Sequence, residues 1–422
     1  MKFVSTRGKA PAVCASEAIM QGLAPDGGLY VPQSFPPLTH LAIHEISSYP
    51  ELAFEVLAPF FEDDPLREDL AEICMDAFNF PVPLFTLREQ ETVLELFHGP
   101  TAAFKDFGAR FLAACMERML AKQQRRLTIL VATSGDTGGA VAAAFANRKG
   151  IDVKVLYPKG RVSGRQQQQL TCWGGNIQAY EVDGSFDDCQ KMVKEAFMDK
   201  DISLQWGLSS ANSINLGRLL PQSVYYVFAS HLYNQAFGKK PTIIIPSGNV
   251  GNSCAAFWAL TMGAPIERIV LSVNENRTIP DFLSSGTYQP RDSVQTLANA
   301  MDVGAPSNME RLFHLYPDTD TLARMLTAYS VDDPTIEATI KEVYGELGYI
   351  LCPHTATGER VRRDYFAGQP TIVVSTAHPA KFEQVVEPLI GTTIEVPENL
   401  AKLLDKNASF KAIGTDYKEL FN

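Results

Sequence analysis

Long apolar runs, paired cysteines and histidine motifs are missing from this 422-residue sequence. No run reaches the roughly 18 apolar residues of a membrane span, so no membrane-spanning helix is expected. The seven cysteines are scattered and never spaced CxxC, which argues against a disulfide framework or a zinc site. The seven histidines form no HExxH pair, and no bound metal is expected.

An excess of positive charge is also missing. The formal net charge of −11 argues against nucleic acid and acidic membrane surfaces as general partners. Any anionic ligand must therefore be bound by local donors rather than by the field of the whole molecule. The first seven residues, MKFVSTR, lack the apolar core of a signal peptide, and scattered cysteines suit a reducing compartment. A cytoplasmic location is expected.

What the sequence does contain is a regular alternation of strands and helices. From about residue 91, β-branched apolar runs of strand length alternate with helical patterns. This alternation predicts an α/β fold of mostly parallel sheets covered by helices. The predicted strands are 127–133, 151–157, 176–182, 241–245, 268–273 and 370–376, and the predicted helices are 110–122, 140–147, 163–172, 186–198, 218–237 and 253–262.

The two ends of the chain differ from this pattern. Residues 1–90 are punctuated by prolines and have a helical period at 51–61 and 66–78, which predicts a helical N-terminal segment. Residues 91–395 are predicted to form the core, in which 306–350 are helical, and 396–422 are predicted to be a polar C-terminal tail.

The segment LFHGPTAAFKDFG, residues 96–108, places Lys105 between Phe104 and Phe107. Aromatic neighbours disfavour the charged ammonium and lower the pKa of the amine. A lysine that attacks a carbonyl needs this change, because only the neutral amine is a nucleophile. The alternative is a lysine that packs its methylenes at a helix start and keeps its ammonium in solvent.

Two loops of small residues join a strand to a helix. Ser247–Asn252 (SGNVGN) can turn its backbone N–H groups inward beside a helix N-terminus, which suits a phosphate. Thr133–Gly138 (TSGDTG) gathers hydroxyls and N–H groups that suit a carboxylate. The alternative for the second loop is a tight turn in which Ser134 or Asp136 caps the following helix.

Further candidates lie near strand and helix ends. Asn215 precedes the predicted helix 218–237 and Arg218 begins it. An arginine there can bind an oxyanion, or it can be a surface residue of a capped helix. Thr376 ends a buried strand, where its hydroxyl needs a partner. Lys159 and Arg161 are expected to be solvated loop charges, whereas His98, His354 and His378 are expected to be structural.

These motifs resemble those of the threonine synthases, a family of pyridoxal phosphate (PLP) enzymes in the tryptophan-synthase-β-like, or fold-type II, superfamily. The resemblance runs from Gln21–Pro32 to Thr376–Phe382 (TAHPAKF), with Val250 and Asn252 standing where the family usually has Phe and Asp. It implies two mostly parallel sheet domains, of which the smaller, approximately 110–217, is a cofactor domain inserted in the larger. It also implies a cytoplasmic monomer or homodimer.

The resemblance further implies a role for each candidate. Lys105 would hold PLP as a Schiff base, Thr376 would face its pyridine nitrogen, and a loop of six residues would hold its phosphate: Ser247, Gly248, Asn249, Val250, Gly251 and Asn252. The substrate carboxylate would be bound by Thr133, Ser134, Asp136 and Thr137, and the substrate phosphate by Asn215 and Arg218.

The reaction so implied converts O-phospho-L-homoserine and water to L-threonine and phosphate, in threonine biosynthesis. The nearest alternative enzyme is a PLP lyase that releases phosphate without net addition of water. A second is a serine or threonine dehydratase, which the N-terminal segment and the AFKDFG motif disfavour. The third alternative is a PLP fold that has lost catalysis and binds only as a regulatory protein, which the intact Lys105 disfavours.

Overall fold

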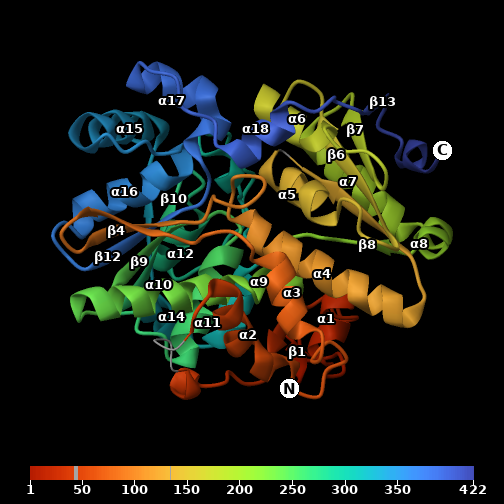
Figure 1. The fold of residues 1–422 in the computed structure, drawn as a ribbon, viewed down its shortest axis with the longest axis horizontal. Coiled ribbons are helices and arrows are strands. Elements are labelled where there is room, and N and C mark those ends of the chain that lie inside the picture. The colour runs from red at the N-terminus through yellow and green to blue at the C-terminus, as the bar shows by residue number, and fades with distance from the viewer. Residues whose placement is uncertain (42–45, 134) are drawn as a thin grey trace.

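The computed structural model describes residues 1–41, 46–133 and 135–422 and contains two large sheets flanked by helices (Figure 1). The predicted α/β class is therefore confirmed. The larger sheet has the strand order β11-β10-β9-β12-β4-β3 and the smaller one β13-β7-β6-β5-β8. A further pair, β1 (Phe3–Ser5) and β2 (Tyr30–Pro32), is antiparallel and lies in the N-terminal segment.

The six-stranded sheet is parallel except for β3, which pairs antiparallel with β4. Its central strands β9 and β12 are buried along their whole lengths, as expected for a sheet that helices cover on both faces. The strands are β3 (Leu84–Arg88), β4 (Glu91–Glu95), β9 (Thr242–Pro246), β10 (Arg268–Val273), β11 (Leu326–Ser330) and β12 (Thr371–Ser375).

The five-stranded sheet is parallel throughout. Its strands are β5 (Leu127–Ala132), β6 (Ile151–Pro158), β7 (Ile177–Val182), β8 (Leu208–Ser209) and β13 (Lys411–Ile413). Around it lie α4 (Lys105–Gln123), α5 (Asp136–Phe145), α6 (Gly164–Thr171), α7 (Phe186–Met198) and α8 (Lys200–Trp206). Both α6 and α7 begin with a capping box, in which a serine and the residue three positions later bond each other's backbone N–H.

The remaining helices belong to the N-terminal segment or to the larger sheet. The N-terminal helices are α1 (Ala15–Gln21), α2 (Tyr49–Leu57) and α3 (Leu70–Ala77). With the larger sheet lie α9 (Leu216–Leu219), α10 (Gln222–Phe237), α11 (Gly251–Met262), α12 (Thr278–Ser285), α13 (Met309–Leu315), α14 (Thr319–Met325), α15 (Asp333–Leu347), α16 (Pro353–Tyr365), 3-10 helix η5 (Pro379–Phe382) and α17 (Glu383–Ile390). Helix α4 packs against α1, α3, α5 and α9, so it connects the N-terminal segment to both sheet units.

Several predicted boundaries differ from the structure. The single helix predicted over 218–237 is two helices, because Pro221 has no N–H to continue α9 and instead begins α10. Helix α5 starts at Asp136 rather than at residue 140, despite Gly138 and Gly139. The helical region predicted over 306–350 contains strand β11, which the short apolar run Leu326–Ser330 did not reveal.

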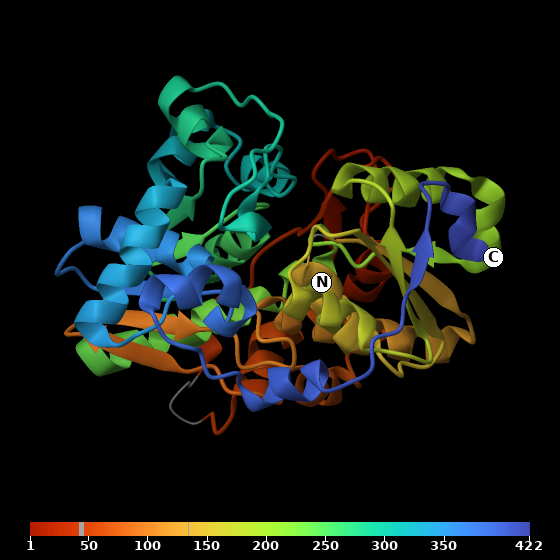
Figure 2. The same cartoon turned by 90° about the horizontal axis from the view of Figure 1, so that it is seen from above.

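The segment predicted to be a polar tail, 396–422, is folded. It contains α18 (Glu398–Leu404), β13 and the 3-10 helix η6 (Tyr417–Phe421). Figure 2 shows this blue segment running from the larger sheet unit to the smaller one, where β13 pairs in parallel with β7. Leu420 is fully buried in the apolar cluster beneath η6. Short polar segments with three buried leucines among them, Leu400, Leu403 and Leu420, give too weak a periodic signal to be recognised as strand or helix.

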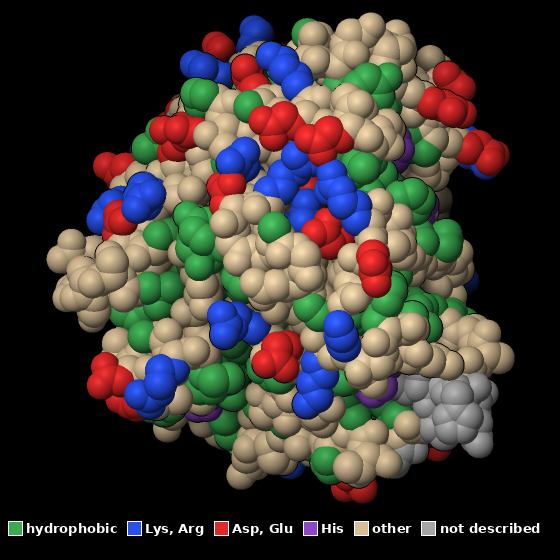
Figure 3. Space-filling view, turned by 90° about the vertical axis from the view of Figure 1, so that its left-hand side faces the viewer, with side chains coloured by type: hydrophobic (Ala, Val, Ile, Leu, Met, Phe, Trp, Pro, Cys, Tyr) green, Lys and Arg blue, Asp and Glu red, His purple; other side chains and the backbone are tan. Residues whose placement is uncertain are grey.

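The charge pattern of the surface and the position of a cleft affect which ligands can bind. Acidic and basic side chains lie next to one another on the face in Figure 3, so local donors rather than one broad charged field must bind an anion there. No helix within the described ranges is long and apolar enough to cross a membrane. A cleft of about 1980 Å³ has walls that include Thr133, Thr137, Asn215 and Asn249.

Candidate active site

Lys105 is the first residue of α4, and backbone bonds fix where that helix begins. Phe104 N–H donates to the carbonyl of Thr376 at 2.8 Å, and Ala103 forms a bridge with Ala377. The lysine motif is thus attached to the end of β12, at the carboxyl edge of the larger sheet. This is the edge at which parallel α/β sheets bind ligands.

Lys105 is largely enclosed, with 14% of its side chain exposed, and its Nζ lies 5.9 Å from the ring centroid of Phe104. Burial lowers the pKa of this amine to about 8, although the carboxylate of Asp136 opposes the change; Lys381 and Arg218 add to it. The expected lowering of the pKa is therefore present, and burial rather than the aromatic contact is its largest cause.

Asp136 begins α5 and brings a carboxylate from the smaller sheet unit to Lys105. Its Oδ2 lies 4.0 Å from Lys105 Nζ, and its Oδ1 lies 3.0 Å from Lys381 Nζ. Burial alone would raise the pKa of Asp136, but Lys381 and Lys105 lower it below its usual value. The carboxylate is therefore ionised and cannot donate a hydrogen bond.

The sequence analysis did not identify Lys381 as a functional residue. Its side chain is 1% exposed, and its ammonium also donates to the carbonyl of Thr101 in the lysine motif at 2.6 Å. The available signal was its place five residues after Thr376, beyond the carboxyl end of a buried strand. Its pairing with Asp136 joins residues 245 positions apart, which spacing in one sequence does not indicate.

The loop Ser247–Asn252 follows β9, which is the neighbour of β12, so it lies on the same sheet edge as Thr376. Gly248 is needed for close approach: a Cβ there would be 2.7 Å from the backbone Cα of Met301. Val250 adopts a left-handed conformation (φ 62°) immediately before α11, which is strained for a β-branched residue. The first N–H groups of α11, from Gly251 onward, have no acceptor within the helix and are available to an anion.

The polar side chains of this loop are tied to neighbouring segments. Asn249 donates to Ser213 Oγ at 2.7 Å and accepts from Ser307 N–H at 2.6 Å. Ser247 Oγ contacts Ser253 Oγ. Anion binding here would therefore rest on the backbone N–H groups more than on these two side chains.

Two buried donors near these segments lack a partner among the described residues, Arg218 Nε and Asn252 Nδ2. The Oδ1 of Asn252 lies 2.6 Å from the Tyr225 hydroxyl and 2.5 Å from the Tyr226 hydroxyl, which fixes the amide. An unpartnered buried donor is costly, and an anionic ligand would remove that cost. The residues present therefore fit a phosphorylated cofactor and an anionic substrate.

Arg218 and Asn215 lie in and before α9. Asn215 caps this helix by accepting from Gly217 N–H at 2.8 Å, and it donates to the carbonyl of Ile19 at 2.9 Å. Arg218 donates to the carbonyl of Ala211 at 2.6 Å, and burial lowers its pKa to about 10, so it stays charged near neutral pH. Arg218 thus keeps a free donor, whereas the Asn215 side chain is already bonded at both ends.

The loop after β5 is partly helical, because Asp136 and Thr137 are the first residues of α5. Thr133 Oγ accepts from Gly135 N–H at 3.0 Å and from Gly138 N–H at 2.9 Å, which shapes the turn. Thr137 is half-buried in the wall of the cleft. Ser134, the fourth predicted residue of this loop, lies outside the described residues.

The other candidates differ in burial. Lys159 and Arg161 are exposed, in accordance with solvated loop charges. His354 is buried, its Nε2 accepts from Ala300 N–H at 3.1 Å, and burial lowers its pKa to about 4. It is therefore neutral near pH 7.

The chain is similar to known proteins along its whole length. Models of three families match: pyridoxal-phosphate dependent enzyme at residues 82–374, threonine synthase N terminus at 2–78 and threonine synthase C-terminal at 355–421. Threonine synthase of Escherichia coli (strain K12) is 38% identical over 411 residues, which are 96% of this chain and 95% of that protein. Threonine synthase of Buchnera aphidicola subsp. Acyrthosiphon pisum is 39% identical over 409 residues, 96% of this chain and 95% of that protein.

The likeness extends to a solved structure, that of PLP-bound threonine synthase from Brucella melitensis. It is 38% identical, covers 100% of this chain and 98% of its own, and superposes with a TM-score of 0.93. The predicted family and cofactor are thereby confirmed. The chain belongs to the threonine synthase family of pyridoxal-phosphate-dependent lyases.

Proposed function

We propose that this chain converts O-phospho-L-homoserine and water to L-threonine and phosphate, and that Lys105 is its catalytic residue. The observation that carries the assignment of Lys105 is its enclosed amine, whose pKa burial lowers to about 8, at the carboxyl edge of the larger sheet. The membership of the chain in the threonine synthase family along its whole length supports the proposed reaction.

Lys105 would carry the cofactor covalently, with its phosphate on the backbone N–H groups of Ser247–Asn252 and Thr376 facing its ring nitrogen. The free donor of Asn252 supports a phosphate at this loop. When bound, PLP supplies an electron sink next to the reacting carbons of the amino acid. A neutral threonine hydroxyl at the ring nitrogen would leave that sink weaker than an acidic partner would.

The protein's own part in the reaction is proton transfer, orientation and exclusion of water. The neutral amine of Lys105 would remove the proton at Cα of the substrate and then help to remove one at Cβ. Phosphate would leave from Cγ, a proton would return to Cγ, water would add its hydroxyl at Cβ, and a proton would return to Cα. The low exposure of the Lys105 and Asp136 side chains, 14% and 4%, supports a site that holds bulk water away from these steps.

Two further anion sites would orient the substrate. Its carboxylate would lie at the start of α5, among Thr133, Ser134 and Thr137 and the backbone N–H of Asp136, because the Asp136 side chain is an acceptor. Its phosphate would lie near Asn215 and Arg218, where the free Nε of Arg218 supports binding of an oxyanion.

Product analysis tests the proposal. With O-phospho-L-homoserine, the PLP-loaded protein should release threonine and phosphate in equal amounts. Phosphate without threonine would favour the phospho-amino-acid lyase. The wild-type protein should show a visible absorption band that borohydride bleaches, and mass spectrometry should then place the cofactor on Lys105. A borohydride-reducible band that persists in Lys105→Ala without added amine would contradict the lysine assignment.

Cytoplasmic location and a monomeric or homodimeric state belong to the same proposal. The expected location rests on the free cysteines, which suit a reducing compartment. Light scattering coupled to size-exclusion chromatography decides the oligomeric state, because a monomer corresponds to 46.4 kDa.

A further inference from the structure

Two lysines, the buried Lys381 and the largely enclosed Lys105, share one carboxylate in this site. Lys381, from η5 after β12, lies 3.0 Å from Asp136 Oδ1, whereas Lys105, from α4, lies 4.0 Å from Oδ2. The exposed fractions of the Lys381 and Asp136 side chains are 1% and 4%. Solvent therefore cannot stabilise either of these charges. The single carboxylate of Asp136 has to stabilise the ammonium groups of both lysines.

The sharing is unequal, and the reason is structural. The Lys381 ammonium also donates to the carbonyl of Thr101 at 2.6 Å, and Thr101 is held by Asp106 through its N–H at 2.8 Å and its hydroxyl at 2.7 Å. Gln166 Nε2 lies 3.4 Å from the same Oδ1 of Asp136. Lys381 and Gln166 thus both contact the Asp136 carboxylate at Oδ1. The other oxygen, Oδ2, stays beyond hydrogen-bond distance of Lys105.

A direct ion pair with Asp136 would stabilise the protonated form of Lys105, and a nearby like charge destabilises it. We propose that Lys381 is a positioning residue for the Lys105 amine: it holds the carboxylate of Asp136 by the far oxygen, so that Lys105 gives up its proton more readily. The relevance to catalysis rests on the proposed function, in which the neutral Lys105 amine moves protons. The charge arrangement itself does not depend on that role.

Other charged or titratable groups face this cluster from neighbouring elements. Arg218 on α9 stays charged and destabilises the protonated Lys105, and it would do so equally in a Lys381 variant. His354 on α16 is neutral near pH 7, because burial lowers its pKa to about 4. Asp106 on α4 faces Lys381 through Thr101. None of these groups takes the place of Lys381 at Asp136 Oδ1.

The test measures the protonation of Lys105 in the cofactor-free protein. The rate at which a small amine-reactive ester modifies Lys105, followed by peptide mass spectrometry over pH 6–10, gives the midpoint of its titration. Lys381→Met should raise this midpoint by one unit or more, so that labelling at pH 7 slows about tenfold. Asp136→Asn should lower the midpoint and speed labelling, because the stabilising carboxylate charge is lost.

Lys381→Arg keeps the charge and is the matched control, with a midpoint close to that of the wild type. In the PLP-loaded enzyme, the acid limb of the pH profile of kcat, which reports groups of the enzyme–substrate complex, should move to higher pH in Lys381→Met. An unchanged or lowered midpoint in Lys381→Met, or no acceleration in Asp136→Asn, overturns the proposal. If Lys381→Met does not fold, Lys381→Gln, which also removes the charge, provides the same test.

The result of this labelling test can be distinguished from the result that tests the proposed function. The labelling experiment contains no PLP, whereas borohydride reduction of the wild-type protein reports whether Lys105 carries PLP. Opposite shifts in the two variants together with a cofactor on another lysine would uphold the charge arrangement and reject the catalytic assignment.

Discussion

At the scale of single residues, the free donor of Arg218 is the feature that most directly addresses substrate binding. Arg218 is 3% exposed, its Nη1 donates to the carbonyl of Ala211, and its buried Nε has no partner among the described residues. Arg218→Ala should therefore lower kcat/KM for O-phospho-L-homoserine on the order of a thousandfold, since a buried charge-assisted contact is lost. The measurement is threonine and phosphate released per cofactor.

The Arg218→Ala protein should keep its visible cofactor absorption, because the proposed PLP contacts lie elsewhere. Arg161→Ala, which removes an exposed loop arginine, is the control and should retain wild-type kinetics. Unchanged kcat/KM in Arg218→Ala would remove Arg218 from the substrate site.

At the scale of helices and strands, the sequence predicted the βα units well where strands were buried and β-branched, as in β9 and β12. It failed where tertiary contacts define the element. Strand β13 has two exposed residues of three and exists because β7 offers it an unpaired edge. Helix α4 was predicted to begin at residue 110, yet it begins at Lys105, where backbone bonds to residues 376–378 fix its first turn.

The same limit applies to the candidate site. Lys105 and the glycine loop were identifiable because their signals are local, a lysine between aromatics and a strand–loop–helix turn. Lys381 could not be identified in this way, because its partners Thr101 and Asp136 are distant in sequence. The pairing of the Asn215 side chain with Ile19 O is likewise non-local, and it shows why an amide near an expected phosphate site can already be occupied by the fold.

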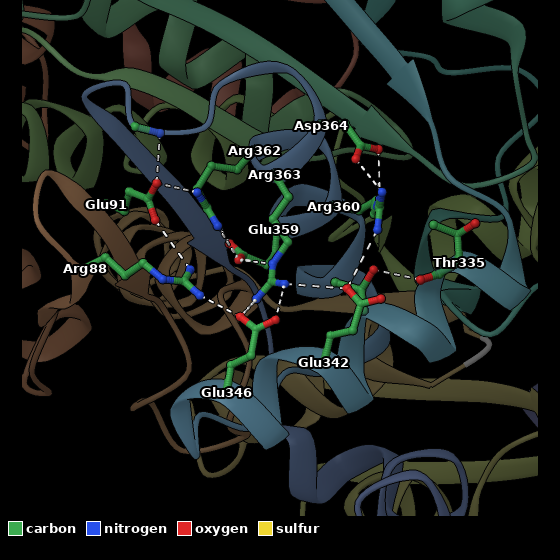
Figure 4. Close-up of polar contacts among 12 residues, drawn as sticks. Arg88, Glu91, Thr335, Glu342, Glu346, Glu359, Arg360, Arg362, Arg363 and Asp364 are labelled. Atoms are coloured by element: carbon green, nitrogen blue, oxygen red, sulfur yellow. Dashed lines mark hydrogen bonds and ion pairs between the residues drawn. The ribbon is translucent and has the colours of Figure 1, made fainter.

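Helix α16 illustrates how burial decides the strength of ion pairs (Figure 4). Glu359, which is 1% exposed, receives hydrogen bonds from Arg362 at 2.7 and 2.8 Å, and Arg362 also lies 2.6 Å from Glu91 on β4. Glu359→Ala would leave a buried guanidinium with one partner fewer, which typically costs about 3–5 kcal/mol of unfolding free energy. Chemical denaturation of the PLP-loaded protein measures this loss.

The matched control lies on the same helix. Asp364 pairs with Arg360, and both side chains are about one-third exposed, at 37% and 29%. Asp364→Ala should change the unfolding free energy by less than about 1 kcal/mol, because solvent screens such pairs. Equal losses in the two variants would contradict the view that burial makes the difference.

At the scale of the whole molecule, the proposed cofactor site draws on both sheet units. The loop Ser247–Asn252 follows β9 of the larger sheet, Asp136 follows β5 of the smaller one, and Lys105 stands between them on α4. A ligand that binds only the native protein stabilises it, by about 4 kcal/mol at a thousand times its Kd. PLP should therefore stabilise the native arrangement of the two units as well as supply chemistry.

Thermal unfolding of the protein with and without PLP tests this, and the tryptophans give a local signal. Trp258 lies on α11, the helix that follows the Ser247–Asn252 turn, whereas Trp173 and Trp206 belong to the smaller unit. In a Trp173→Phe, Trp206→Phe protein, Trp258 fluorescence should follow the same transition as circular dichroism when PLP is bound. Removal of PLP should lower the Tm by several degrees. The midpoint of the Trp258 fluorescence transition should fall by more than the midpoint measured by circular dichroism. A Tm that does not respond to PLP, with full occupancy verified by absorbance, would contradict a cofactor site shared by the two units.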